Sequence, residues 1–133
     1  MTKLGNFDFR EFEKYRDNLK AMEKAVPGFL EECVQELAKR LLDKSIGRTP
    51  TDQEDVRRGW TIGNVIFTSN GAAIQVFNVN ESSSFVEYGQ RLANGRGWKE
   101  GKFMMTISLK ELEQQIPTIL EKKMKRCVKG FLG

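Results

Sequence analysis

The sequence of 133 residues contains no histidine, only two cysteines and three prolines. The lack of histidine removes the commonest general base, the commonest metal ligand and every serine–histidine or cysteine–histidine nucleophile pair. No run approaches the roughly 18 apolar residues that span a bilayer, and the first residues lack the apolar core of a secretory signal. We therefore expect a protein with no enzymatic activity, cofactor or metal that stays in the cytoplasm in which it is made.

Few other residues are candidates for chemistry. Cys33 and Cys127 lie far apart and lack metal-ligand spacing, so we expect two reduced and mostly buried thiols. Glu81 and Glu87 are the nearest candidates for a catalytic carboxylate pair. Carboxylates at strand ends are usually solvated charges, so this alternative is the weaker one.

The charge of the chain is unevenly placed. One small globular domain covering residues 1–133 is expected from the length, the 39% hydrophobic content and the 30% charged content. Residues 1–101 carry 15 basic and 15 acidic side chains, whereas residues 102–133 carry 7 basic and 3 acidic ones, which accounts for the net charge of +4. This basic segment fits contact with DNA or an acidic partner, although cations at a helix C-terminus also match the helix dipole. The candidate contacts are Lys122, Lys123, Lys125 and Arg126.

Helical periodicity marks the two ends of the chain. Residues 1–6 are expected to form a flexible arm, and apolar residues at three- and four-residue steps then predict a first helix over about 8–25. Pro27 fits the first turn of a second helix. Its apolar stripe predicts the main core element and comprises Phe29, Leu30, Cys33, Val34, Leu37, Ala38, Leu41 and Leu42. A capping box at Ser108 and Glu111 predicts the start of a C-terminal helix, which Pro117 should kink or divide.

A hinge at residues 48–60 separates the helical half from strands. Pro50 should end the preceding helix, Asp52 or Asp55 should cap a short turn, and Trp60 should be buried against the second helix. Strands are predicted over 60–67, with a bulge or turn at 63–64, and over 72–79, the latter central in the sheet. Ser69, Asn70 and Gly71 predict the hairpin between them.

The segment after this hairpin is less regular. Residues 85–88 read as a short strand or a helical turn ended by Gly89, and residues 103–107 as a last strand. The fold class is therefore α+β, with two N-terminal helices and a kinked C-terminal helix packed on a small, mainly antiparallel sheet.

A glycine-rich stretch at residues 90–101 predicts an exposed, mobile loop that orders on assembly. It lacks the G-K-[ST] ending of a nucleotide-binding loop. Its basic and aromatic side chains have no expected local partner, so they are candidate interface residues: Arg91, Arg96, Trp98 and Lys99.

Three motifs taken together resemble a known family. They are R-T-P-T-D-Q-E-D-V-R-R-G-W at 48–60, F-V-E-Y-G-Q-R at 85–91 and G-K-F-M-M at 101–105. In order and spacing, the chain from Ala25 to Glu121 is similar to the small neck or tail-completion proteins of tailed bacteriophages and prophages. The family commonly has a glycine just after the turn aspartate, where this chain has Gln53, Glu54 and Asp55.

The resemblance implies a structural virion assembly protein. It implies a subunit at the head–tail junction, in a ring around the DNA channel, whose partners are neighbouring neck, connector and tail proteins and further copies of itself. The implied location is the virion, and the host bacterial cytoplasm during assembly. The alternative is a small basic protein that binds DNA or a partner without catalysis. That alternative lacks a helix-turn-helix, zinc or sheet-aromatic motif.

Overall fold

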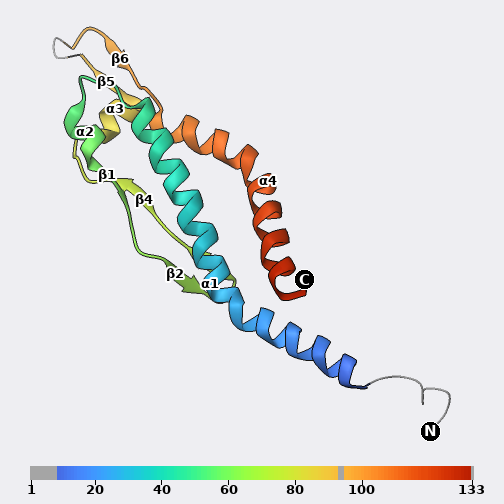
Figure 1. Cartoon of the computed structure of the whole chain (residues 1–133). Helices are drawn as coiled ribbons and strands as arrows, with labels where there is room; N and C mark the ends of the chain where they lie inside the picture. The colour runs from blue at the N-terminus through green and yellow to red at the C-terminus, as the bar shows by residue number, and fades with distance from the viewer. Residues whose placement is uncertain (1–8, 93–94, 133) are drawn as a thin grey trace.

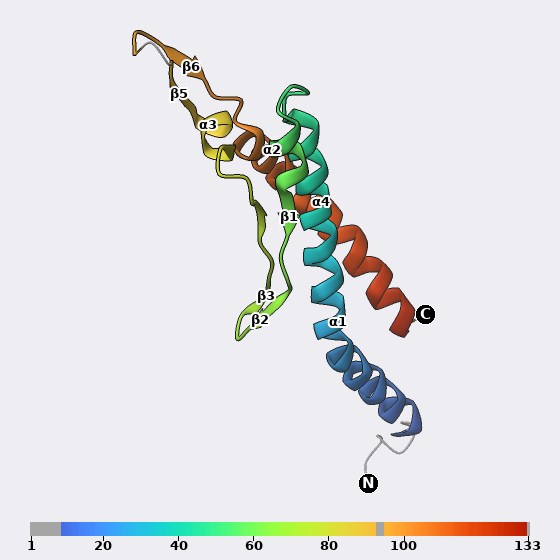
Figure 2. The same cartoon turned by 90° about the vertical axis from the view of Figure 1, so that its left-hand side faces the viewer.

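The computed structural model describes residues 9–92 and 95–132, in which two long helices enclose short strands along the chain. α1 (Phe9–Arg48) and α4 (Met104–Leu132) run antiparallel along the molecule (Figures 1 and 2). The strands pair as three antiparallel two-stranded sheets, and they come between the two helices in the sequence. The fold is therefore α+β, as the change in hydrophobic period predicted. The expected arm at residues 1–6 lies outside the described residues.

α1 is one continuous helix of 40 residues, so the prediction of two N-terminal helices is wrong. A proline inside a helix removes one hydrogen bond to the carbonyl four residues earlier, which here belongs to Glu23. Both Pro27 and Glu23 are exposed, so water can satisfy the freed carbonyl. The predicted core stripe follows this point, with Cys33 and Ala38 buried and its other residues half-buried.

Thr49 connects the end of α1 to two distant parts of the chain. Its hydroxyl donates a hydrogen bond to the carbonyl of Ser45 at 2.7 Å and accepts one from Trp60 Nε1 at 2.8 Å. The sulfur of Met104, the first residue of α4, lies 3.1 Å from the same hydroxyl. Because Thr49 is only 4% exposed, these contacts are shielded from water. The hinge is therefore a packed junction of α1, β1 and α4.

The short helix α2 (Glu54–Gly59) follows the hinge without the predicted aspartate cap. Its N-cap residue is Gln53, and no side chain makes a cap hydrogen bond there. The backbone itself closes the turn, since Gln53 N donates to Pro50 O and Arg57 N donates to Gln53 O, each at 3.0 Å. Asp52 and Asp55 remain exposed. Trp60 is half-buried rather than buried, although its indole N–H donates to the buried hydroxyl of Thr49.

The predicted hairpin around residues 69–71 is confirmed, in two separate parts. β1 (Trp60–Ile62) pairs with β4 (Val76–Asn78), and β2 (Ile66–Thr68) pairs with β3 (Gly71–Ala73), both antiparallel. The predicted break at residues 63–64 falls between β1 and β2. The strand expected over 72–79 is not central, because each sheet has two strands only. α1 contacts β1, β3 and β4 and so covers part of the hairpin. Apolar side chains that α1 does not cover, such as Phe77 and Val79, are exposed.

Residues 83–91 form a helical turn followed by a strand. α3 (Ser83–Tyr88) is capped by Gly89, whose φ of 95° favours glycine, so Gly89 ends the helix as predicted. β5 (Gly89–Arg91) then pairs with β6 (Trp98–Glu100) in an antiparallel hairpin. Residues 89–91 and 98–100 are therefore paired strands and not the irregular loop that the glycine content predicted. Their pairing satisfies the backbone N–H and C=O groups of this exposed stretch.

α4 begins at Met104, so the prediction of a strand over residues 103–107 is wrong. Glu87 supplies the reason: its carboxylate accepts hydrogen bonds from the amides of Met105 and Thr106 at 2.8 and 2.9 Å. These amides lie in the first turn, where a helix has no internal acceptors. Ser108 consequently lies inside α4, fully buried, and does not form the predicted capping box.

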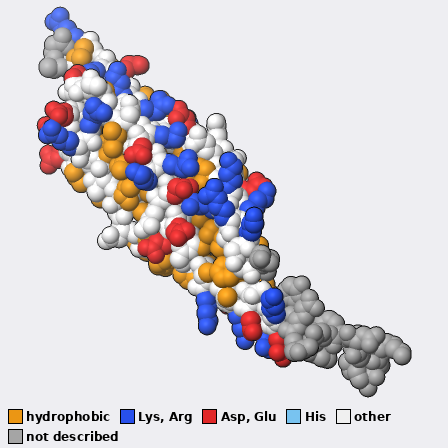
Figure 3. Space-filling view, in the orientation of Figure 1, with side chains coloured by type: hydrophobic (Ala, Val, Ile, Leu, Met, Phe, Trp, Pro, Cys, Tyr) orange, Lys and Arg blue, Asp and Glu red, His pale blue; other side chains and the backbone are white. Residues whose placement is uncertain are grey.

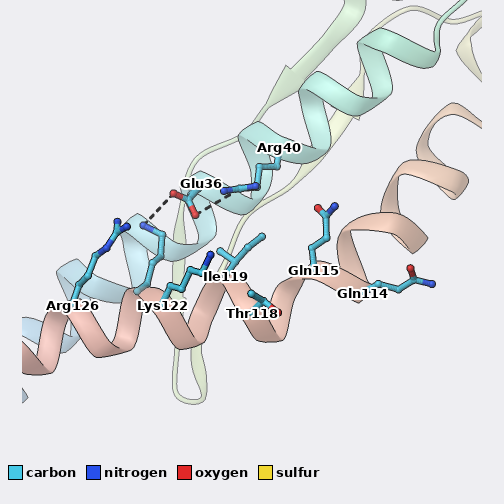
Figure 4. A pocket seen from close by; sticks show the side chains of 9 residues that line it. Glu36, Arg40, Gln114, Gln115, Thr118, Ile119, Lys122 and Arg126 are labelled. Atoms are coloured by element: carbon cyan, nitrogen blue, oxygen red, sulfur yellow. Dashed lines mark ion pairs between the residues drawn. The ribbon is translucent and has the colours of Figure 1, made fainter.

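Pro117 bends α4 without dividing it. The helix continues through the proline to Leu132, but its direction changes midway in Figure 1. Figure 4 places the bend between Gln115 and Thr118. The predicted kink is confirmed, and it follows from the clash of a proline ring with the preceding turn.

The core follows the contact between α1 and α4, and α2 adds Val56 to it. Its buried apolar side chains are Cys33, Ala38, Val56, Met104 and Leu112. Burial raises the pKa of the Cys33 thiol, so it stays uncharged at neutral pH. Glu111 on α4 joins the upper ends of the two long helices through ion pairs with Lys44, at 3.2 Å, and Arg48. The hydrogen bond from Lys44, together with Arg48, lowers the pKa of Glu111.

Candidate functional site

The residues that the sequence left as candidates for chemistry do not come together in the described structure. The sequence has no histidine, and the described residues contain no group of three His, Cys, Asp or Glu that could hold a metal ion. Glu81 and Glu87 do not form a pair of reacting carboxylates. Glu81 is exposed, whereas Glu87 is buried and holds the start of α4. Three surfaces remain to be considered.

The first surface is the β5–β6 hairpin, which projects from one end of the molecule (Figures 1 and 2). Its register places Arg91 opposite Trp98 and Gln90 opposite Lys99. Trp98 is 60% exposed, and Leu92 is exposed beside it. The structure therefore brings together on one projection the four candidate interface residues, namely Arg91, Arg96, Trp98 and Lys99.

The second surface is a groove between α1 and α4, shown in Figure 4. It has a volume of about 480 Å³. We call it the α1–α4 groove, and it is lined by Glu36, Arg40, Gln114, Gln115, Thr118, Ile119, Lys122, Lys123 and Arg126. Glu36 accepts ion pairs from Lys123 at 3.3 Å and from Arg40 at 3.7 Å. The groove thus holds four cations and one carboxylate, and two of the cations pair with that carboxylate.

The candidate cations of α4 divide between this groove and the outer surface. Lys122, Lys123 and Arg126 line the groove. Lys125 does not line it and pairs instead with Glu121, one helical turn earlier, at 3.0 Å. Figure 3 shows Lys and Arg side chains gathered along the seam of the two long helices. The predicted basic segment is therefore a structured surface, in which neighbouring residues have different surroundings.

The third surface is apolar and discontinuous. Large side chains are exposed on the hairpins and beside α3, among them Ile66, Phe67, Phe77, Val79, Phe85, Tyr88 and Phe103. Tyr88 and Phe103 make an edge-to-face ring contact, with 6.4 Å between centroids. Figure 3 shows apolar side chains reaching the surface between charged ones. Such exposure is typical of a chain that buries more surface on association.

Two participants in these surfaces were not singled out by the sequence. Glu36 and Arg40 read as ordinary charges of an amphipathic helix, although both line the groove. Their role depends on the register between α1 and α4, which the ion pairs Lys44–Glu111 and Glu36–Lys123 reveal. Helical charges that pair across a distant seam leave no local sequence motif.

The described part of the chain is elongated, with its hairpins and two long helices spread along its length (Figures 1 and 2). Within the described part of the chain, no helix is long and apolar enough to cross a membrane.

Comparison with known proteins relates the chain to a known family. Residues 13–89, which run from α1 to the end of α3, match a family model described as "Bacteriophage HK97-gp10, putative tail-component". Neither the curated proteins nor the solved structures gave a match. The matched span covers more than half of the chain, and it includes the hinge and the first hairpin.

The family match thus identifies the chain as a structural component of a larger assembly. The chain belongs to the HK97-gp10-like family of bacteriophage tail components. This finding confirms the resemblance carried by the three sequence motifs. It also means that the protein contacts other virion proteins.

Proposed function

We propose that this protein is a neck or tail-completion subunit, which joins or finishes the tail at the head–tail junction of a tailed phage or prophage. In this proposal it acts in the virion as a ring around the channel through which DNA leaves the capsid. Its partners are further copies of itself and the adjoining neck, connector and tail proteins. The observation that carries the proposal is the family match over residues 13–89.

Exposed apolar side chains at separate places support a subunit with neighbours on more than one side. Ile66 and Phe67 are exposed on the β2–β3 hairpin, and Trp98 is exposed on the β5–β6 hairpin. Large exposed apolar side chains are typical of surfaces that bind other proteins. A ring needs two different faces on each subunit, because its contacts run head to tail.

The projecting hairpin and the helical seam support two such faces. The hairpin carries Trp98 and Leu92, which are exposed apolar side chains of the kind found at interface centres. The seam lies away from it along the length of the molecule (Figure 2) and is basic. In the proposed ring, the hairpin residues Arg91, Arg96, Trp98 and Lys99 contact a neighbouring subunit or virion protein.

Electron microscopy of particles made without this protein tests the proposal. We expect filled heads and separate tails, or tails with defective ends, and we expect a plasmid copy of the gene to restore joined particles. Purified protein should be monomeric or weakly self-associating in sedimentation until a neck or tail protein supplies a template. Joined, infectious particles in the absence of the protein would overturn the proposal.

The alternative of a small DNA-binding protein is favoured only by the cations on α4. It predicts duplex binding whose affinity falls steeply with salt, because each neutralised phosphate releases counterions. Binding would then depend on Lys122, Lys123, Lys125 and Arg126 together. Nonspecific contact of the same residues with DNA in the channel is compatible with the ring. The two functions differ in whether particles without the protein are joined.

A further inference from the structure

The charges of the α1–α4 groove are unevenly satisfied. Glu36 is its single carboxylate, and Lys123 and Arg40 already pair with it. Lys122 and Arg126 have no hydrogen-bond or ion-pair partner among the described residues. A concave surface with several cations concentrates positive potential and attracts an anion. The groove therefore has the charge of a binding site for negatively charged groups.

A hollow beside the groove places a second requirement on the ligand. An adjoining hollow of about 560 Å³ shares Lys123 and Arg126 with the groove. The rest of its lining includes the apolar side chains of Ala25, Phe29 and Cys127 and one carboxylate, Glu32. Cations thus stand directly beside apolar surface. A ligand that satisfies both regions carries carboxylates next to an apolar side chain, because burying only the charges would leave the apolar hollow in water.

We propose that the α1–α4 groove binds an acidic peptide segment of a partner protein, with carboxylates at Lys122 and Arg126 and an apolar side chain beside Phe29. Arginine suits this role because its guanidinium can hold a carboxylate through two parallel hydrogen bonds. Gln114, Gln115 and Thr118 line the other end of the groove and can bond the peptide backbone.

A peptide fits the site better than a DNA duplex does. The groove is a hollow between two helices, and Glu36 lies within it (Figure 4). A duplex presents its phosphates on a broad convex surface, so it would meet the rims and not the hollow. A duplex also offers no apolar side chain to the hollow beside Phe29. The identification of the partner as another virion protein rests on the proposed function. The binding of an acidic peptide in the groove does not depend on that function.

The test uses the full chain and a fluorescent peptide of consecutive glutamates, with binding followed by anisotropy at low salt. A second peptide with one central leucine should bind more tightly. Arg126→Glu should weaken binding by about tenfold or more, as the loss of a charge-assisted contact does. The matched control Lys125→Glu makes the same charge change on the next residue, outside the groove, and should weaken binding less than about threefold. Glu36→Gln should strengthen binding, because it releases Lys123 and Arg40.

Three outcomes would overturn the proposal. They are equal losses in Arg126→Glu and Lys125→Glu, no binding of either peptide, or a duplex oligonucleotide that binds more tightly and displaces the peptide. Circular dichroism checks that each variant is folded, and Lys122→Glu replaces Arg126→Glu if that variant unfolds. Failure of peptide binding leaves the head–tail proposal open to its own test, since microscopy of joined particles does not depend on the groove.

Discussion

The Oε2 atom of Glu87 accepts two hydrogen bonds from Thr106, one from the backbone amide at 2.9 Å and one from the hydroxyl at 2.7 Å. Oε1 of the same carboxylate accepts from the amide of Met105 at 2.8 Å. Glu87 is buried in α3, the helical turn that precedes the β5–β6 hairpin. One side chain therefore fixes both the start of α4 and the base of the projecting hairpin.

Removal of this carboxylate should destabilise the chain. Glu87→Ala leaves two amides of the first turn of α4 without an acceptor, so we expect a loss of about 2 kcal/mol in the free energy of unfolding. Glu87→Gln keeps one acceptor oxygen and should lose about 1 kcal/mol. Glu81→Ala is the matched control, because Glu81 is exposed, and it should change stability by less than about 0.5 kcal/mol. Urea denaturation measures all three, and equal stability of the Glu87 and Glu81 variants would contradict the capping role.

The two tryptophans should respond differently to substitution. Trp60 is half-buried and donates to Thr49 at 2.8 Å, whereas Trp98 is largely exposed on the hairpin. Trp60→Phe keeps the ring but removes the donor, and should lose about 1 kcal/mol of stability. Trp60→Ala should lose about 3 kcal/mol, and Trp98→Ala less than about 0.5 kcal/mol. Chemical denaturation followed by circular dichroism distinguishes them, and a larger loss for Trp98→Ala would reverse the assignment of core and interface.

The predictions from sequence succeeded where local pattern determines structure. The helical stripe after Pro27, the hairpin at residues 69–71, the stop at Gly89 and the bend at Pro117 all depend on residues close in the chain. The failures occurred where distant contacts decide. Residues 103–107 have a strand-like composition, but the carboxylate of Glu87 satisfies the amides of a helix there. Pro27 reads as a helix start, yet α1 runs through it.

The candidate binding surfaces were likewise predictable only where they depend on residues close in the chain. The clustering of Arg91, Trp98 and Lys99 on one projection follows from a short stretch of sequence, although its hairpin pairing did not. The α1–α4 groove depends on which residues of two helices face each other across the seam. Glu36 and Lys123 are 87 positions apart in the chain and 3.3 Å apart in space. Charge composition predicted a basic surface, but not that Arg126 lines the groove whereas its neighbour Lys125 lies outside it.

Ser108 offers a substitution that should stabilise the protein. Its hydroxyl is fully buried in α4 and has no hydrogen-bond partner within the described structure. An unsatisfied buried hydroxyl is unfavourable, and alanine also has the higher helix propensity. Ser108→Ala should therefore raise the free energy of unfolding by about 1 kcal/mol. Ser84→Ala in α3 controls for propensity, because Ser84 is exposed. Thermal denaturation measures both, and a destabilised Ser108→Ala variant would show that the hydroxyl has a partner.

Acid should weaken the contact between the upper ends of α1 and α4. The hydrogen bond from Lys44, with Arg48 beside it, holds the pKa of Glu111 below its usual range. A depressed carboxyl pKa contributes stability above the unfolded-state pKa, and this contribution is lost as pH falls through the folded-state pKa. Glu111→Gln should therefore be less stable than the wild type at neutral pH. The difference should shrink below about pH 4.3, the ordinary glutamate value. Glu113→Gln on the exposed face is the control, and a difference independent of pH would contradict the mechanism.

The backbone hydrogen bonds between β5 and β6 should open often in the free protein and become protected only on assembly. An isolated two-stranded hairpin is marginally stable in water, and this one pairs three residues on each strand. Hydrogen exchange of the free protein should therefore be fast at Gln90 and Lys99, while the amides of α1 near Cys33 remain protected by the core. In assembled particles the same hairpin amides should exchange slowly, because in the proposed assembly a neighbour covers Trp98. Trp98→Ala should leave exchange in the free protein unchanged and reduce incorporation into particles. Strong protection of Gln90 and Lys99 in the free monomer would show instead that the hairpin is a rigid part of the fold, independent of any partner.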